Sequence, residues 1–139
     1  MFGRKRKKVA VVLTCADWRL HHSRVDMNRR LARALKVHGA DVIAAPGPNG
    51  LTLPARKSEW QSALDQIKLL IGAHHPTALA VVAHQRCAGH PVSDDEHVTD
   101  VSKTARMLKA ETGFAGPVAA MVAVYHSDAK WDFKTIETV

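Results

Sequence analysis

The sequence predicts an α/β fold in which a mainly parallel sheet carries helices on both faces. Two observations predict it. Short apolar runs alternate along the chain with segments whose apolar residues recur every three to four positions. Most of these runs are almost continuously apolar, which is typical of parallel strands buried on both faces. We expect the common strand order 2-1-3-4 with one additional edge strand.

Five segments are expected to be strands. Four are apolar runs, and the fifth alternates apolar and polar residues, which favours an exposed edge strand. In chain order they cover residues 9–14, 41–45, 78–83, 118–124 and 131–136. A loop rich in proline and glycine, residues 46–50, follows the second strand.

Three segments are expected to be helices. The first covers residues 24–38, the second covers residues 58–72, and the third, which Asp94 or Asp95 can cap, ends near Gly113. Ser58 and Gln61 have the spacing of a capping box at the start of the second helix. Gly39 and Gly72 are expected to end the first two helices, because glycine adopts the left-handed conformation common at helix ends.

The length and charge indicate one globular domain with a basic tail. The 139 residues are enough to bury a hydrophobic core, so we expect a single domain over residues 1–139. The net charge is +7, and five basic residues occupy positions 4–8. We expect residues 1–8 to be a flexible tail. The rest of the chain lacks the interleaved basic and aromatic residues of a nucleic-acid interface, so nucleic acid is not an expected partner.

The sequence gives no sign of a membrane segment. No apolar stretch approaches the ~20 residues that span a bilayer. The apolar run after the basic residues is shorter than the ~7–15 residues of a signal-peptide core. Two cysteines kept reduced for metal binding fit a cytoplasmic location, which is the location we expect.

Two short polar clusters directly follow the first and third expected strands. Cys15, Asp17 and Arg19 form one cluster, and His84 and Cys87 form the other. The chain contains no other cysteine. In the expected strand order the carboxyl ends of these two strands flank one crevice. Two thiolates and an imidazole suit zinc with one position left open, which is typical of a catalytic metal.

Other interpretations of these residues are open. Cys15 and Cys87 could be small buried side chains or a disulfide, with His84 a hydrogen-bonded core histidine. Their equivalent positions at strand ends favour a metal site. Asp17 could ligate the metal, accept a hydrogen bond from metal-bound water or orient that water, with Arg19 holding it in a bidentate pair. The two could also form an ordinary surface ion pair.

The ordered pair of motifs resembles the beta-class carbonic anhydrases. The motifs are Cys15-Ala-Asp17-Trp-Arg19 and His84-Gln-Arg-Cys87, and the similarity extends over residues 9–124. The resemblance implies Zn²⁺ bound by Cys15, His84 and Cys87, and hydration of CO₂ to bicarbonate by a metal-bound hydroxide. It also implies that Asp17 and Arg19 are catalytic residues that orient or gate the fourth zinc position.

The resemblance further implies a homodimer or a multiple of one. Pairing between copies could use the apolar strand at residues 118–124 and the edge strand at residues 131–136, since an exposed edge invites strand addition. Three histidines near the motifs, His21, His22 and His90, are candidates for a proton shuttle.

Two departures from the family's pattern leave other functions open. Arg86 stands where the family has an acidic residue beside the ligand, and Trp18 is bulkier than the usual residue at its position. A reshaped pocket would favour hydrolysis of carbonyl sulfide or carbon disulfide on the same fold. The basic tail leaves a third hypothesis, a non-catalytic zinc-binding module.

Overall fold

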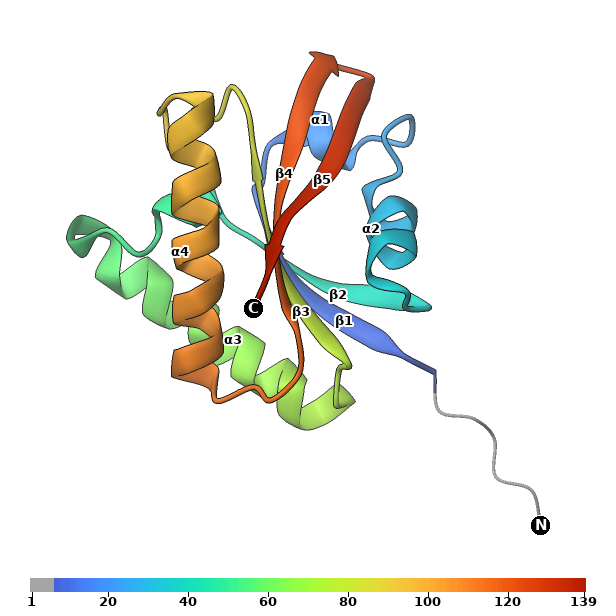
Figure 1. Ribbon diagram of the computed structural model, residues 1–139, viewed down its shortest axis with the longest axis vertical. Helices are drawn as coiled ribbons and strands as arrows, with labels where there is room; N and C mark the ends of the chain where they lie inside the picture. The colour runs from blue at the N-terminus through green and yellow to red at the C-terminus, as the bar shows by residue number, and fades with distance from the viewer. Residues whose placement is uncertain (1–6) are drawn as a thin grey trace.

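One five-stranded sheet forms the centre of the protein (Figure 1). The computed structural model describes residues 7–139. The strands are β1 (Val9–Thr14), β2 (Gly39–Ala44), β3 (Ala78–His84), β4 (Val118–Ser127) and β5 (Lys130–Thr138). Their order is β2-β1-β3-β4-β5, with β5 antiparallel to β4 and the other pairs parallel. The predicted fold class and strand order are therefore confirmed. Most of the expected basic tail, residues 1–6, lies outside the described residues.

Helices cover both faces of the sheet (Figure 1). The helices are α1 (Trp18–His21), α2 (Met27–Leu35), α3 (Lys57–His74) and α4 (Asp94–Thr112), with short 3₁₀ turns η1 (Pro48–Gly50) and η2 (Pro54–Arg56). Helices α3 and α4 lie on one face, and α1 and α2 lie on the other. Every residue of β3 is buried because both of its faces are covered, as the apolar run predicted.

Two hydrophobic cores result from the alternation of side chains along the strands. Val11 and Leu13 of β1 pack on the side of α3 and α4. Ala10 and Val12, the intervening residues, pack on the side of α1 and α2. This second core also contains Trp131 of β5, whose exposed fraction is 0%.

The predicted bounds of the first two helices were wrong. Helix α2 starts at Met27 and not at residue 24. Helix α2 ends at Leu35, because Lys36 adopts a left-handed backbone with a φ of 56°, and Gly39 instead begins β2. Helix α3 starts at Lys57 without a side-chain cap, since η2 leads the chain into it already in a helical conformation. It also runs through Gly72 to His74. Local backbone geometry, and not glycine, ends both helices.

The third helix differs from the prediction only at its start. Ser93 caps α4, and its Oγ accepts a hydrogen bond from the Glu96 N–H at 3.2 Å. Asp94 and Asp95 lie in the first turn, where their charge interacts favourably with the helix dipole. Gly113 ends the helix with a φ of 68°, as predicted.

The position of β4 rules out the predicted use of this strand for pairing between copies of the chain. Strand β4 pairs with β3 on one side and with β5 on the other. It is therefore unavailable for pairing between copies of the chain, and among residues 7–139 only β2 and β5 have a free edge in this sheet. The homodimer stays a prediction, and strand addition would have to use one of these two edges.

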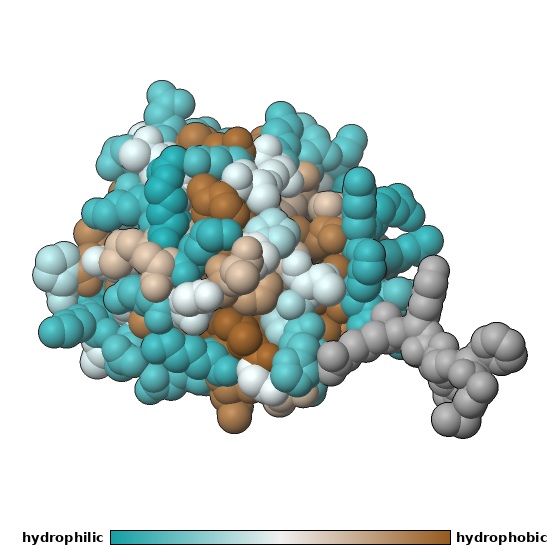
Figure 2. Space-filling view, turned by 60° about the horizontal axis from the view of Figure 1, so that its bottom comes forward, coloured by the Kyte–Doolittle hydropathy of each residue, from teal (hydrophilic) through white to brown (hydrophobic). Residues whose placement is uncertain are grey.

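The surface is mostly polar on the face drawn in Figure 2. Hydrophilic side chains cover most of it, and hydrophobic ones form separate small areas. Over residues 7–139, the structure contains no helix with both the length and the apolar character that crossing a membrane requires.

Two glycines bring the loop after β2 and the loop after β3 into backbone contact. A Cβ on Gly47 would lie 2.6 Å from the carbonyl carbon of Gly89, and a Cβ on Gly89 would lie 2.6 Å from the Gly47 nitrogen. Gly47 also has a φ of 55°, which side chains disfavour. Arg56 joins the loops further, since its Nη1 donates to the Gly47 carbonyl at 3.1 Å and to the Gly89 carbonyl at 3.3 Å.

We expect Gly47→Ala to lower the free energy of unfolding by about 2 kcal/mol, because it adds a clash and a strained backbone. Gly72→Ala is the matched control. No atom lies within 4 Å of a Cβ at this exposed helical position. The control should be neutral or more stable by about 0.5–1 kcal/mol. Urea unfolding measures both variants, and equal stabilities would contradict the proposed loop contact.

Candidate metal centre

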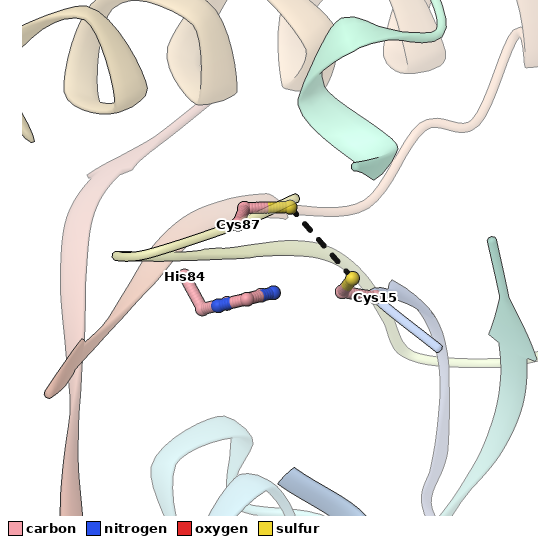
Figure 3. Close-up of side chains that lie close together, drawn as sticks. All are labelled: Cys15, His84 and Cys87. Atoms are coloured by element: carbon pink, nitrogen blue, oxygen red, sulfur yellow. Dashed lines mark hydrogen bonds between the residues drawn. The ribbon is translucent and has the colours of Figure 1, made fainter. Parts of the chain in front are cut away.

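Cys15, His84 and Cys87 lie together at the carboxyl ends of two neighbouring strands (Figure 3). Cys15 directly follows β1, His84 is the last residue of β3, and Cys87 comes three residues later. One donor atom from each side chain lies within 4.8 Å of the other two. All three residues are buried, so the surrounding structure fixes the positions of their side chains.

The backbone at Arg86 turns the chain back toward Cys15. Arg86 has a φ of 57°, a left-handed conformation that reverses the chain direction between His84 and Cys87. Its guanidinium lies 4.0 Å from the centre of the Tyr125 ring. The side chain that departs from the family's motif thus stacks on Tyr125.

The hydrogen bonding of His84 leaves one ring nitrogen free to be a ligand. Its Nδ1 lies 2.6 Å from the backbone carbonyl of Gln85. A carbonyl only accepts, so Nδ1 carries the proton and Nε2 carries the lone pair. Nε2 is buried and has no hydrogen-bond partner among the described residues. A bare, buried imidazole nitrogen beside two sulfurs fits a metal ligand, and its orienting carbonyl is the usual partner of such a ligand.

The separation of the two sulfurs also fits zinc. The Sγ atoms lie 3.9 Å apart, far beyond a disulfide bond, and both cysteines are free. Two thiolates bound at ~2.3 Å in a tetrahedral arrangement would be about 3.8 Å apart. Their mutual contact lowers the pKa of Cys87 and raises the pKa of Cys15, so the metal-free pair shares one proton. Zinc binding would release that proton.

Asp17 and Arg19 form a bidentate ion pair next to these ligands. Asp17 caps α1 by accepting from the Arg19 N–H at 3.0 Å. The Arg19 guanidinium donates to Oδ1 at 3.1 Å and to Oδ2 at 2.7 Å. These bonds hold the pKa of Asp17 below its usual value, so the carboxylate is ionised. Its Oδ2 lies 3.8 Å from His84 Nε2, which puts a negative charge at the edge of the donor set.

Two aromatic residues far along the chain hold Arg19 in place. The centre of its guanidinium lies 5.8 Å from the Tyr125 ring and 5.4 Å from the Trp131 ring. Trp131 also meets the His84 ring edge to face, with centroids 5.6 Å apart. Sequence reasoning missed both aromatics, because only the pairing of β4 with β3 and of β5 with β4 brings them to the site.

A cavity of about 240 Å³ opens beside the donor set. Its walls are Cys15, Ala16, Asp17, Pro46, Ala88 and Gly89. Trp18 does not line it, since this side chain is 67% exposed and lies next to His22 with ring centroids 5.9 Å apart. The cavity therefore has small, largely apolar walls with one carboxylate, which suits a small uncharged molecule.

The three histidines proposed as proton shuttles make other contacts. The Nε2 of His21 lies 2.7 Å from the Cys15 carbonyl, and that of His22 lies 2.7 Å from the Asp128 carbonyl. His90 is buried, and its Nε2 lies 2.7 Å from Asp100 Oδ2. The described residues that line the cavity include no histidine.

His97 forms a buried polar pair behind the Cys87 loop. The Asn49 amide Nδ2 donates to His97 Nδ1 at 2.9 Å, and the His97 ring packs against that of His90 with centroids 5.7 Å apart. Burial, above all other causes, lowers the pKa of His97. The ring is therefore neutral in the folded protein.

This buried histidine should make stability fall with decreasing pH. In the unfolded chain a histidine binds its proton near pH 6.5. Below that value the unfolded state binds a proton at His97 and the folded state does not. The free energy of unfolding therefore decreases as the pH falls, until the pH reaches the lowered pKa of the folded state. We expect the free energy of unfolding to fall less steeply in His97→Gln than in the wild type as the pH is lowered from about 7.5, measured by urea unfolding of metal-free protein. Equal pH dependence in the two proteins would contradict this.

Comparisons with known proteins agree with this geometry. The model of a protein family described as "Putative carbonic anhydrase" matches residues 5–137, nearly the whole chain. A comparison with curated proteins finds no match. The two motifs, which the sheet brings together at the ends of β1 and β3, agree with the family match. The chain therefore belongs to this carbonic anhydrase family.

Proposed function

We propose that the protein hydrates CO₂ to bicarbonate with zinc held by Cys15, His84 and Cys87. One observation carries the proposal. The bare Nε2 of His84 lies in a buried set with two sulfurs, and an ionised Asp17 stands 3.8 Å from it at a cavity. Buried polar side-chain atoms usually have a hydrogen-bond partner, so a nitrogen without one beside two sulfurs supports a metal ligand here.

The three ligands set the charge of the site. When bound, zinc supplies a Lewis acid that lets water ionise near neutral pH and add to the carbon of CO₂. Two thiolates would balance the two charges of the ion, while His84 would bind through Nε2 with its Nδ1–H donated to the Gln85 carbonyl. His84 is also fixed in orientation by the Trp131 ring.

Asp17 and Arg19 would position the reacting water. The Asp17 carboxylate can accept a hydrogen bond from a water molecule at the open side of the donor set and thereby direct its lone pair toward the cavity. Arg19 donates hydrogen bonds to both carboxylate oxygens of Asp17. This bidentate pair favours an Asp17 bound to the guanidinium over an Asp17 bound to the metal. Arg19 is itself held between two aromatic rings and the Arg86 carbonyl, at 3.0 Å.

The cavity walls favour the substrate that we propose. Carbon dioxide is small, linear and uncharged, and Ala16, Pro46 and Ala88 offer it an apolar surface. Bicarbonate is charged, so the neighbouring Asp17 carboxylate would disfavour its retention. This contrast favours release of the product.

We expect Asp17→Asn to lower kcat/KM for CO₂ hydration by 10- to 100-fold while zinc content stays at the wild-type level. The asparagine keeps the shape of the side chain but removes the charge that orients water. Stopped-flow hydration and metal analysis measure the two quantities. Trp18→Ala is the matched control, because this neighbouring side chain is 67% exposed and should leave the rate unchanged.

Cys15→Ser defines the background rate, since it removes a ligand. Zinc-loaded wild-type protein that hydrates CO₂ no faster than this variant would refute the proposal. Sulfide release from carbonyl sulfide or carbon disulfide without CO₂ turnover would identify a different substrate. Tight zinc binding with no turnover of any of the three would favour a non-catalytic module.

A further inference from the structure

A second hollow, separate from the metal site, gathers positive charge between α2 and the turn that joins β4 to β5. It has a volume of about 500 Å³. Its charged lining residues are Arg24, Asp26, Arg29, Arg30, Arg33 and Lys130. It shares no lining residue with the cavity beside Cys15. Five cations and one carboxylate therefore face a concave surface to which the proposed reaction assigns no role.

The cations of this hollow lack acidic partners. Among residues 7–139, none of the four arginines lies within 4.0 Å of a carboxylate, and Asp26 makes no ion pair either. Elsewhere in the protein, exposed arginines do find such partners, as Arg106 does with Glu137. Like charges held together repel one another, and a bound anion would relieve the repulsion. The pattern is therefore that of a site built for a negatively charged ligand.

One arginine of the hollow is already fixed in orientation. Arg30 Nη1 donates to the backbone carbonyl of Trp131, and its guanidinium lies 5.5 Å from the Phe133 ring. A second hollow of about 390 Å³ adjoins the first, shares Arg30 and Arg33, and is also lined by Phe133 and by one carboxylate, Asp132. An arginine held in this way loses little side-chain conformational entropy when it binds a ligand. Its planar guanidinium can donate two parallel hydrogen bonds to the oxygens of a phosphate group.

We propose that this hollow binds a soluble ligand carrying two or more linked phosphate groups, such as the diphosphate of a nucleotide. Several positive charges converge on one concavity, which matches a compact ligand of high charge. A nucleic-acid strand would need a longer basic path with exposed aromatic rings on which bases stack. Here the one aromatic ring of the adjoining hollow, Phe133, is covered by Arg30.

Isothermal titration calorimetry with pyrophosphate and with ADP tests the site, using the full-length protein dialysed free of unbound metal. Both probes should bind, more weakly as salt is raised. The double variant Arg29→Gln/Arg33→Gln should bind at least 10-fold more weakly. The double variant Lys68→Gln/Lys103→Gln removes the same charge from exposed positions on α3 and α4, across the sheet, and should change the affinity less than 2-fold.

Three outcomes would overturn the proposal. Neither probe binds at about 50 mM salt, where surface electrostatics are strong. The two double variants lose affinity equally, which would indicate net charge and no defined site. A single-stranded oligonucleotide binds where pyrophosphate and ADP do not, which would indicate a nucleic-acid surface. None of these outcomes depends on CO₂ hydration, so the two proposals fail or hold independently.

Discussion

Parallel pairing of β1 with β3 is the constraint from which the metal centre follows. Their register places Thr14 opposite Val82, so Cys15 and His84 leave neighbouring strands at the same edge of the sheet. Backbone hydrogen bonds fix this register, and burial of both strands on both faces prevents a slip. The short reversal at Arg86 then returns Cys87 to the same point. Two candidate ligands at rigid strand ends and one on a tight turn form a preorganised set.

The charged groups of the site lie in two layers, the three candidate ligands and the groups around them. The inner layer holds two cysteine sulfurs and one imidazole, and the next holds the Asp17 carboxylate, which Arg19 compensates. Trp131 joins the layers, because one fully buried ring contacts both His84 and Arg19. The last strand of the sheet thus supports the chemistry that we propose for the residues following the first and third strands. On its other side, the Trp131 carbonyl fixes Arg30 of the basic hollow.

Much of the fold and of the site could be predicted from sequence, because the signals were local. Apolar runs located the strands, and the motifs after two of them indicated the metal trio and the Asp17–Arg19 pair. The ends of α2 and α3 could not be predicted, since a left-handed lysine and a preceding 3₁₀ turn leave no clear sequence signal. Trp131 and the basic hollow depend on contacts between residues about 100 positions apart, which only the folded sheet creates.

X-ray absorption spectroscopy at the zinc edge of the metal-loaded protein measures the central arrangement most directly. We expect two sulfur ligands at ~2.3 Å and at least one nitrogen ligand at ~2.0–2.1 Å. The Cys87→Ser variant should lose one of the two sulfur contributions. A wild-type spectrum with only oxygen and nitrogen ligands would show that Cys15 and Cys87 do not hold the ion, and would contradict the metal centre described above.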